Sequence, residues 1–183
     1  MANGAPFWKA LATINKGLLL ALDGNESDAI ETFTSGMAAY QSTGATLYRP
    51  QHLSYLASAH AKVGQFEEAW RCISEAITAV ETTKESWYKA EVNRVAGEVA
   101  LKMPEPDAAK AEAYFERALA VARQQQAKSW EVRAAMSMAR LWRDQGKPYQ
   151  ARDLLAPIYG WFTEGFDTRD LKEAKALLEE IAA

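Results

Sequence analysis

A repeat of about 40 residues occurs four times along the chain, and it constrains the fold more than any other feature. Small residues recur at intervals of 40, 40 and 42, namely Gly17, Ala57, Gly97 and Ala139. An alanine follows twelve residues later in three copies and fourteen residues later in the third, namely at Ala29, Ala69, Ala111 and Ala151. Four residues further on stands a large apolar side chain, namely Phe33, Ile73, Phe115 and Leu155. Repeats of this length are typical of stacked helical arrays, in which each unit buries its apolar face against the next.

The physical reason for the small residues is a helical hairpin. Two antiparallel helices approach closely only where a side chain is absent or is a methyl group. In three of the four copies a glycine follows the first small residue by seven, at Gly24, Gly64 and Gly146, where the first helix should end in a left-handed residue. The third copy has the longer, proline-containing loop 102–107 instead. Asn25 and Asp107 are the predicted N-caps of the helices that they precede.

The predicted fold is all-α, with four hairpins and a terminal helix that caps the array. Valine and isoleucine do not cluster into alternating runs, so no strand is predicted. A single domain over 1–183 is expected, with repeats at about 6–45, 46–85, 86–127 and 128–167. The predicted helices are about 6–22, 26–41, 49–63, 66–82, 86–102, 107–125, 129–145, 148–163 and 168–181. The cap helix 168–181 carries Leu171, Ala174, Leu178 and Ile181 on one face, and Pro157 should kink the helix before it.

The pattern of small and large residues resembles the tetratricopeptide repeat. The segments that carry the resemblance are 17–36, which reads G-x6-G-x4-A-x3-F-x2-G, and 111–119, which reads A-x3-F-x2-A-L. The resemblance implies a right-handed α-solenoid that binds protein partners. The period is about 40 rather than 34, so the helices should be longer, and the usual closing proline is absent.

A second resemblance concerns the segments 90–98, 127–135, 139–147 and 155–168. Together they are similar to the C-terminal repeat region of large bacterial signalling proteins. Those proteins carry a class III adenylate cyclase or a DNA-binding domain, then an ATPase module, then helical repeats. The resemblance implies a cytoplasmic regulatory module that is a fragment of such a protein. The sequence contains neither a Gly-rich phosphate loop ending in Lys-Ser/Thr nor a recognisable cyclase aspartate pair.

Composition narrows the functional classes further. The net charge is −3, from 21 Lys and Arg against 24 Asp and Glu, which argues against nucleic acid as a partner. The single cysteine, Cys72, excludes an internal disulfide and fits a reducing compartment. No apolar run approaches the roughly 20 residues of a membrane helix, so no membrane partner is expected.

The residues that could carry chemistry are few. His52 and His60 lie eight residues apart without a cysteine or acidic partner at ligand spacing, which makes a poor metal site. Cys72 has no histidine at readable spacing and is expected to be a buried thiol. The recurrent aromatic residues Trp8, Tyr48, Tyr88 and Trp130 are interpreted as packing between hairpins. We therefore predict no enzyme, no cofactor and no metal.

A candidate partner groove follows from the repeat register. In stacked hairpins the first helices line the concave surface, and one stripe of that surface becomes rich in arginine in the last two copies. Its residues are Glu91, Arg94, Glu98, Arg133, Met136, Arg140 and Arg143. One hypothesis is that the stripe binds an acidic segment or a C-terminal carboxylate. The alternative is that the arginines only pair internally, with Glu91, Glu98 and Glu131.

Two further possibilities stay open from the sequence. The stripe of the first copy, Leu11, Ile14 and Leu18, would be an exposed apolar patch, which favours contact with a preceding repeat or with another protomer. A small-molecule sensor is the alternative function, with a ligand held between the arginine-rich helix and the segment 161–166.

Overall fold

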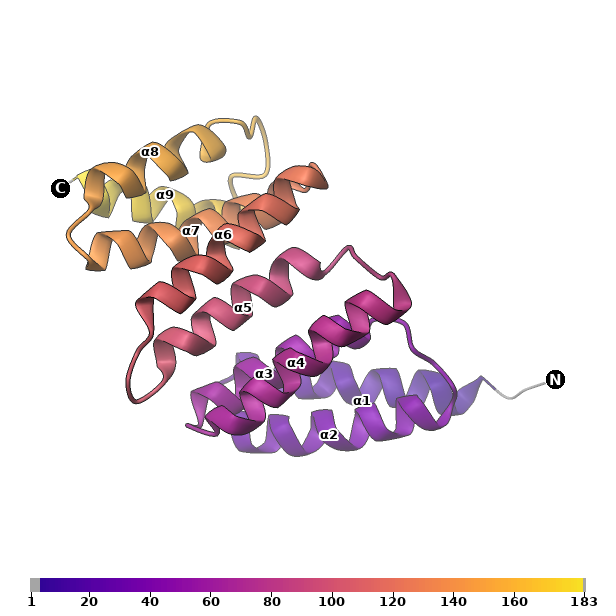
Figure 1. Cartoon of the computed structure of the whole chain (residues 1–183). Helices are drawn as coiled ribbons and strands as arrows, with labels where there is room; N and C mark the ends of the chain where they lie inside the picture. Colours follow the sequence, from indigo (N-terminus) through magenta and orange to yellow (C-terminus); the bar gives the residue numbers. More distant parts are fainter. Residues whose placement is uncertain (1–3, 183) are drawn as a thin grey trace. The chain divides into compact units, whose positions relative to one another are not determined.

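The computed structural model describes residues 4–182, and over these residues it contains nine α-helices and no strand (Figure 1). The predicted all-α class of helical hairpins is confirmed. The helices are α1 (Ala5–Leu22), α2 (Glu26–Ser42), α3 (Arg49–Lys62), α4 (Phe66–Thr83), α5 (Lys89–Lys102), α6 (Ala108–Gln124), α7 (Lys128–Asp144), α8 (Pro148–Tyr159) and α9 (Arg169–Ala182).

The chain divides into two compact units. The first holds residues 1–88 and the short segment 102–105, and therefore the hairpins α1–α2 and α3–α4. The second holds residues 89–101 and 106–183, and therefore most of α5 together with α6 to α9. The single-domain prediction for 1–183 stays a prediction.

Helix ends agree with the predicted ranges to within one residue, except at two places. Helix α5 begins at Lys89 rather than 86, because residues 87–88 form a turn before the helix starts. Helix α8 ends at Tyr159 rather than 163, two residues beyond Pro157. Proline has no N–H to continue the helical hydrogen bonds, and the chain passes through Gly160 into a turn.

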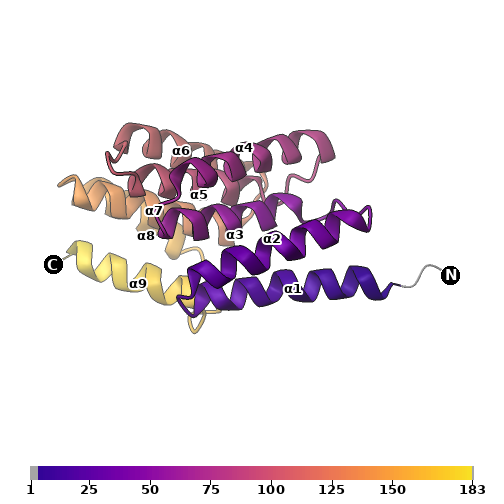
Figure 2. The same ribbon diagram turned by 90° about the horizontal axis from the view of Figure 1, so that it is seen from below.

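Within each hairpin, the small residues of the repeat allow a close helix crossing. Helices α1 and α2 lie side by side (Figures 1 and 2), and Phe33 of α2 is fully buried against Gly17 of α1. A Cβ atom at Gly17 would lie 3.0 Å from the Phe33 ring, and one at Gly36 would lie 2.9 Å from Ile14. There is therefore no room for a side chain at either glycine.

The turns follow the predicted chemistry with one exception. Gly24, Gly64 and Gly146 all have positive φ, between 73° and 81°, as the left-handed helix end requires. The Asp107 carboxylate accepts the backbone N–H of Lys110 at 2.9 Å, so this cap is confirmed. The Asn25 side chain makes no cap bond, so that prediction was wrong. Its amide instead donates to Asp28 at 2.7 Å.

Helix α9 packs against α7 and α8 through one apolar face. Leu171, Ala174 and Leu177 are buried, whereas Leu178 and Ile181 are half-buried. The prediction had Leu178 in place of Leu177, because both satisfy helical spacing and only the packing angle chooses between them. None of the described helices has the length and apolar character needed to cross a membrane.

Candidate functional site

In the second unit, a group of mostly charged side chains surrounds a cavity of about 460 Å³. Three helices, α5, α7 and α9, supply its walls. The lining residues are Arg94, Glu98, Arg133, Met136, Ser137, Arg140, Arg169, Asp170 and Glu173. The structure therefore brings together five of the seven residues predicted for the groove, and Glu91 bonds to two of those five.

A buried ion pair forms the floor of this site. Glu91 is only 3% exposed and accepts hydrogen bonds from Arg94, at 2.8 Å on each oxygen. Arg94 also donates to Glu98 and, at 3.3 Å, to the Ser137 hydroxyl. Arg133 reaches the same Glu91 from α7 at 2.9 Å. Because Glu91 is shared between two guanidinium groups, Arg94 and Arg133 are held in place rather than free to move.

The remaining arginines of α7 pair with acidic residues of α9. Arg140 donates to Glu173 at 3.1 Å, and Arg143 donates to Glu180 at 2.6 Å. Arg133 lies 3.8 Å from Asp170, a looser approach. These acidic partners were not predicted, because helical spacing in the sequence identified only the apolar face of this helix.

Internal pairing of the arginines is thus observed, but not with all the predicted partners. Glu131 belongs to a different cluster. Its oxygens accept from Arg123 at 3.0 Å and from Lys128 at 2.6 Å. Burial tends to raise the pKa of Glu131, but these two hydrogen bonds outweigh burial and leave the pKa below its ordinary value. The expected pairing of Glu131 with the arginine stripe was wrong.

The pairs differ in how much solvent they retain. The Arg94 side chain is 12% exposed, whereas those of Arg140 and Arg143 are 40% and 35% exposed. Met136 is buried at the base of the cavity. The floor of the site is therefore structural. Arg140, which lines the cavity, and Arg143, which lies one turn further along α7 and outside the lining, retain more contact with solvent.

Among the described residues, the side chains that the sequence singled out for chemistry, namely His52, His60 and Cys72, are all buried. No group of three His, Cys, Asp or Glu side chains in this part of the chain could hold a metal ion. His52 is buried without a charged partner, and burial lowers its pKa to about 4. His60 is buried and shares a hydrogen bond of 2.6 Å with Gln65. Cys72 is buried, as expected, and burial raises its pKa to about 11.

The apolar stripe predicted on the first helix needs correction. Ile14 is only 1% exposed, because it packs against Gly36 inside the α1–α2 hairpin, and Leu11 and Leu18 are half-buried. The most exposed apolar side chains of α1 are Trp8, Leu19 and Leu22, at 65%, 61% and 62%. An exposed apolar surface is therefore present on α1, but it lies further round the helix than the predicted stripe.

The aromatic residues that recur once per repeat differ in burial from one repeat to the next. Tyr88 is buried and packs edge-on against Tyr55, with ring centroids 6.3 Å apart. Trp130 is half-buried beside the guanidinium of Arg133, which lies 5.3 Å from the ring centroid. Trp8 is largely exposed, so the interpretation of these aromatic residues as packing between hairpins was wrong for Trp8.

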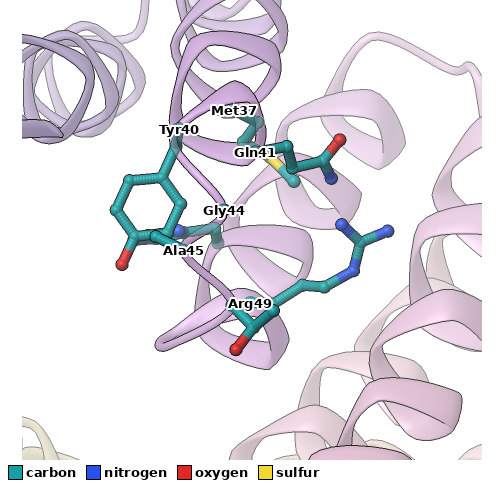
Figure 3. Close-up of a pocket in the computed structure, with 8 residues that line it drawn as sticks. Met37, Tyr40, Gln41, Gly44, Ala45 and Arg49 are labelled. Atoms are coloured by element: carbon teal, nitrogen blue, oxygen red, sulfur yellow. The ribbon is translucent and has the colours of Figure 1, made fainter. Parts of the chain in front are cut away.

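Two smaller cavities lie away from the arginine groove. One, of about 220 Å³, lies between α2 and the start of α3 (Figure 3). Figure 3 shows the Gln41 amide and the Arg49 guanidinium facing the same space, while the Tyr40 hydroxyl points away from them. The other, of about 190 Å³, is lined by Ser129, Val132 and Phe162 among others. It adjoins the predicted sensor segment, but Arg140 and Arg143 do not line it.

The four hairpins and their small-residue crossings define a helical repeat protein of the tetratricopeptide-like class. Two crystal structures share the fold over the whole chain. A kinesin light chain-like protein of Podosopora anserina with nearly identical TPR-like repeats has a TM-score of 0.69 and 15% identity, over 99% of this chain and 87% of that one. A point variant of that protein has a TM-score of 0.67 and 14% identity, over 100% of this chain and 96% of that one. No family model and no curated protein matches the chain. At such identities the likeness concerns the fold alone.

Proposed function

We propose that this chain is a non-catalytic protein-binding module whose groove on α7 accepts an acidic segment of a partner. The observation that carries the proposal is the row of Arg140 and Arg143, which the repeat register places on one face of a first helix. Both side chains keep more than a third of their surface exposed. Their present partners on α9, Glu173 and Glu180, are themselves 37% and 60% exposed, and Asp144, which also pairs with Arg143, is 65% exposed.

Exchange of partners at these arginines should cost little. Exposed ion pairs contribute only about 0–1 kcal/mol each, so an incoming carboxylate can replace Glu173 or Glu180 without a large penalty. A guanidinium can also bind a carboxylate through two parallel hydrogen bonds, which favours acidic side chains and free C-termini. The buried Glu91–Arg94 pair would stay intact beneath the ligand.

The test is selection of random peptides with free C-termini on the immobilised chain. Acidic peptides should be enriched, and their affinity should fall as salt rises. The double variant Arg140→Gln with Arg143→Gln should weaken binding. The control, Arg117→Gln with Arg152→Gln, makes the same change of charge at exposed positions of second helices and should leave binding unchanged. An equal loss of peptide binding in both double variants would contradict the proposal. So would enrichment of peptides that carry no acidic residues.

We further propose that the module serves as a cytoplasmic regulatory arm of a bacterial signalling protein. The support is the sequence similarity of segments such as 139–147 and 155–168 to the repeat regions of such proteins. The expectation that nucleic acid and membranes are not partners belongs to the same proposal. Sequencing of the native gene around this reading frame tests it, because a cyclase or ATPase coding region in the same frame is required.

A small-molecule sensor is the second candidate, and the cavity beside Phe162 favours it. Its lining includes Ser129 and Thr168, which carry hydroxyl groups, and the apolar residues Val132 and Leu171. The volume of about 190 Å³ suits a ligand of only a few heavy atoms. A thermal-shift screen of small metabolites should give a large, reproducible shift that Val132→Trp abolishes if this function is correct.

A further inference from the structure

The outer face of α1 is an apolar stripe that the described chain covers only in part. It comprises positions that share one side of the helix and carry no charge. They are Trp8, Leu11, Ala12, Leu18, Leu19 and Leu22. Trp8, Leu19 and Leu22 are each more than 60% exposed. A contiguous exposed apolar surface on a helix is typical of a contact site.

The middle of the equivalent face is buried in the other hairpins, which shows what kind of element packs there. Ala12 and Leu19 correspond to His52 and Ala59 of α3, which are 5% and 1% exposed. Tyr40 of the preceding helix α2 packs edge-on against His52, with ring centroids 5.6 Å apart. In the second unit the corresponding residues of α7, Ala134 and Leu141, are 1% and 6% exposed. A helix is therefore the element that fits this face.

The stripe is apolar on both sides of its centre, which suits pairing with a second copy of α1. Asn15 lies at the centre of the stripe. For each apolar residue that precedes Asn15 by a given number of positions, another apolar residue follows Asn15 by the same number. The opposed residue numbers add to 30: Trp8 with Leu22, Leu11 with Leu19, and Ala12 with Leu18. Two such helices packed antiparallel about a two-fold axis at Asn15 place apolar groups against apolar groups along the whole stripe. The exposed Asn15 amide then faces its own copy, and an amide both donates and accepts hydrogen bonds.

The opposite end of the chain does not offer an equivalent partner. The exposed face of α9 carries Lys172, Lys175 and Glu179. Head-to-tail stacking would bury these charges against the leucines of α1, which is costly. From the self-complementary pattern of α1 and this mismatch we infer that the chain forms a two-fold homodimer through antiparallel packing of α1 against α1 of a second copy.

The first test is the oligomeric state, measured by sedimentation velocity over a range of concentrations. The wild-type chain should form a dimer that dissociates on dilution. Leu19→Glu should raise the dimer dissociation constant at least about tenfold, because each dimer would bury two unpaired carboxylates. Tyr149→Glu is the matched control, since Tyr149 is 84% exposed on α8, and it should leave the dimer unchanged. Circular dichroism should show both variants folded, because both positions face solvent.

The second test is the register. An Asn15→Cys variant should form a disulfide-linked dimer on mild oxidation with diamide, because the two residues meet at the axis. A Leu22→Cys variant should not, since residues 22 of the two copies would lie about 21 Å apart along the helices. Cys72 can stay in place because it is buried. A wild-type chain that is monomeric at every concentration would overturn the inference. So would a dimer unaffected by Leu19→Glu, or equal cross-linking of both cysteine variants.

Discussion

Gly97 of α5 lies so close to the ring of Phe115 on α6 that a Cβ atom on Gly97 would come 2.7 Å from the ring carbon Cδ1, and closer still to Cε1. The same relationship joins Gly17 and Phe33 in the first hairpin, at 3.0 Å. Where the large residue of the repeat is not aromatic, as with Ile73 and Leu155, the small residue at the corresponding position is alanine. At these two repeat positions, a larger side chain on one helix is therefore matched by a smaller residue on the other helix.

This relationship predicts that Gly97→Ala destabilises the fold. Overpacking of a core costs about 1–3 kcal/mol. The higher helix propensity of alanine returns about 1 kcal/mol, so we expect a net loss of up to about 2 kcal/mol. Urea unfolding measures it. The double variant Gly97→Ala with Phe115→Leu should lose less than the sum of the two single variants, because leucine leaves room for the methyl group. Strict additivity would show that the two residues do not share one space.

His52 predicts a fall in stability at mildly acidic pH. The unfolded chain binds a proton on His52 near pH 6.5, but burial delays this in the folded chain until about pH 4. The contribution of His52 to the free energy of unfolding should therefore be full above pH 6.5. It should decline by up to about 3 kcal/mol as the pH falls toward 4. His52→Phe keeps a ring beside Tyr40 but cannot titrate. Urea unfolding between pH 7 and pH 4 should give a flatter profile for this variant, and parallel profiles would contradict the assignment.

Glu131 predicts a second acid-sensitive contribution at lower pH. Although burial opposes it, the hydrogen bonds from Lys128 and Arg123 hold the pKa of Glu131 below its ordinary value of 4.5. A lowered carboxyl pKa stabilises the folded chain above about pH 4.5, and this stabilisation is lost as the pH falls further. Glu131→Gln should cost about 1–3 kcal/mol at pH 7. The difference from wild type should shrink toward pH 3, and a constant difference would mean that charge is not the cause.

Cys72 predicts an unreactive thiol. Burial raises its pKa from 9.0 to about 11, so the folded chain contains about a hundredfold less thiolate at neutral pH than an exposed cysteine would give. Reaction with a disulfide reagent such as DTNB should therefore be slow in buffer and fast in denaturing urea. Rapid labelling of the native protein would show that Cys72 is accessible.

Much of the fold was predictable because the repeat is visible in the types of residue that recur along the sequence. Glycines with positive φ at Gly24, Gly64 and Gly146 end their helices wherever the chain places them, since only local backbone geometry is involved. The alternation of small and large residues at helix crossings, as in Gly97 and Phe115, repeats four times and can be read without knowing the neighbours. The repeat therefore sufficed to predict the number of hairpins and nearly all of their boundaries.

The tertiary structure alone decided which side chains meet. Arg140 and Arg143 stood out in the sequence, but their partners Glu173 and Glu180 lie more than 30 residues away on α9. Likewise, helical spacing placed Ile14 on an apolar stripe, and only the packing of α2 shows that it lies in the core. Sequence patterns determine which residues share a face of a helix, whereas the angle at which helices pack determines whether that face meets solvent, a neighbour or a charge.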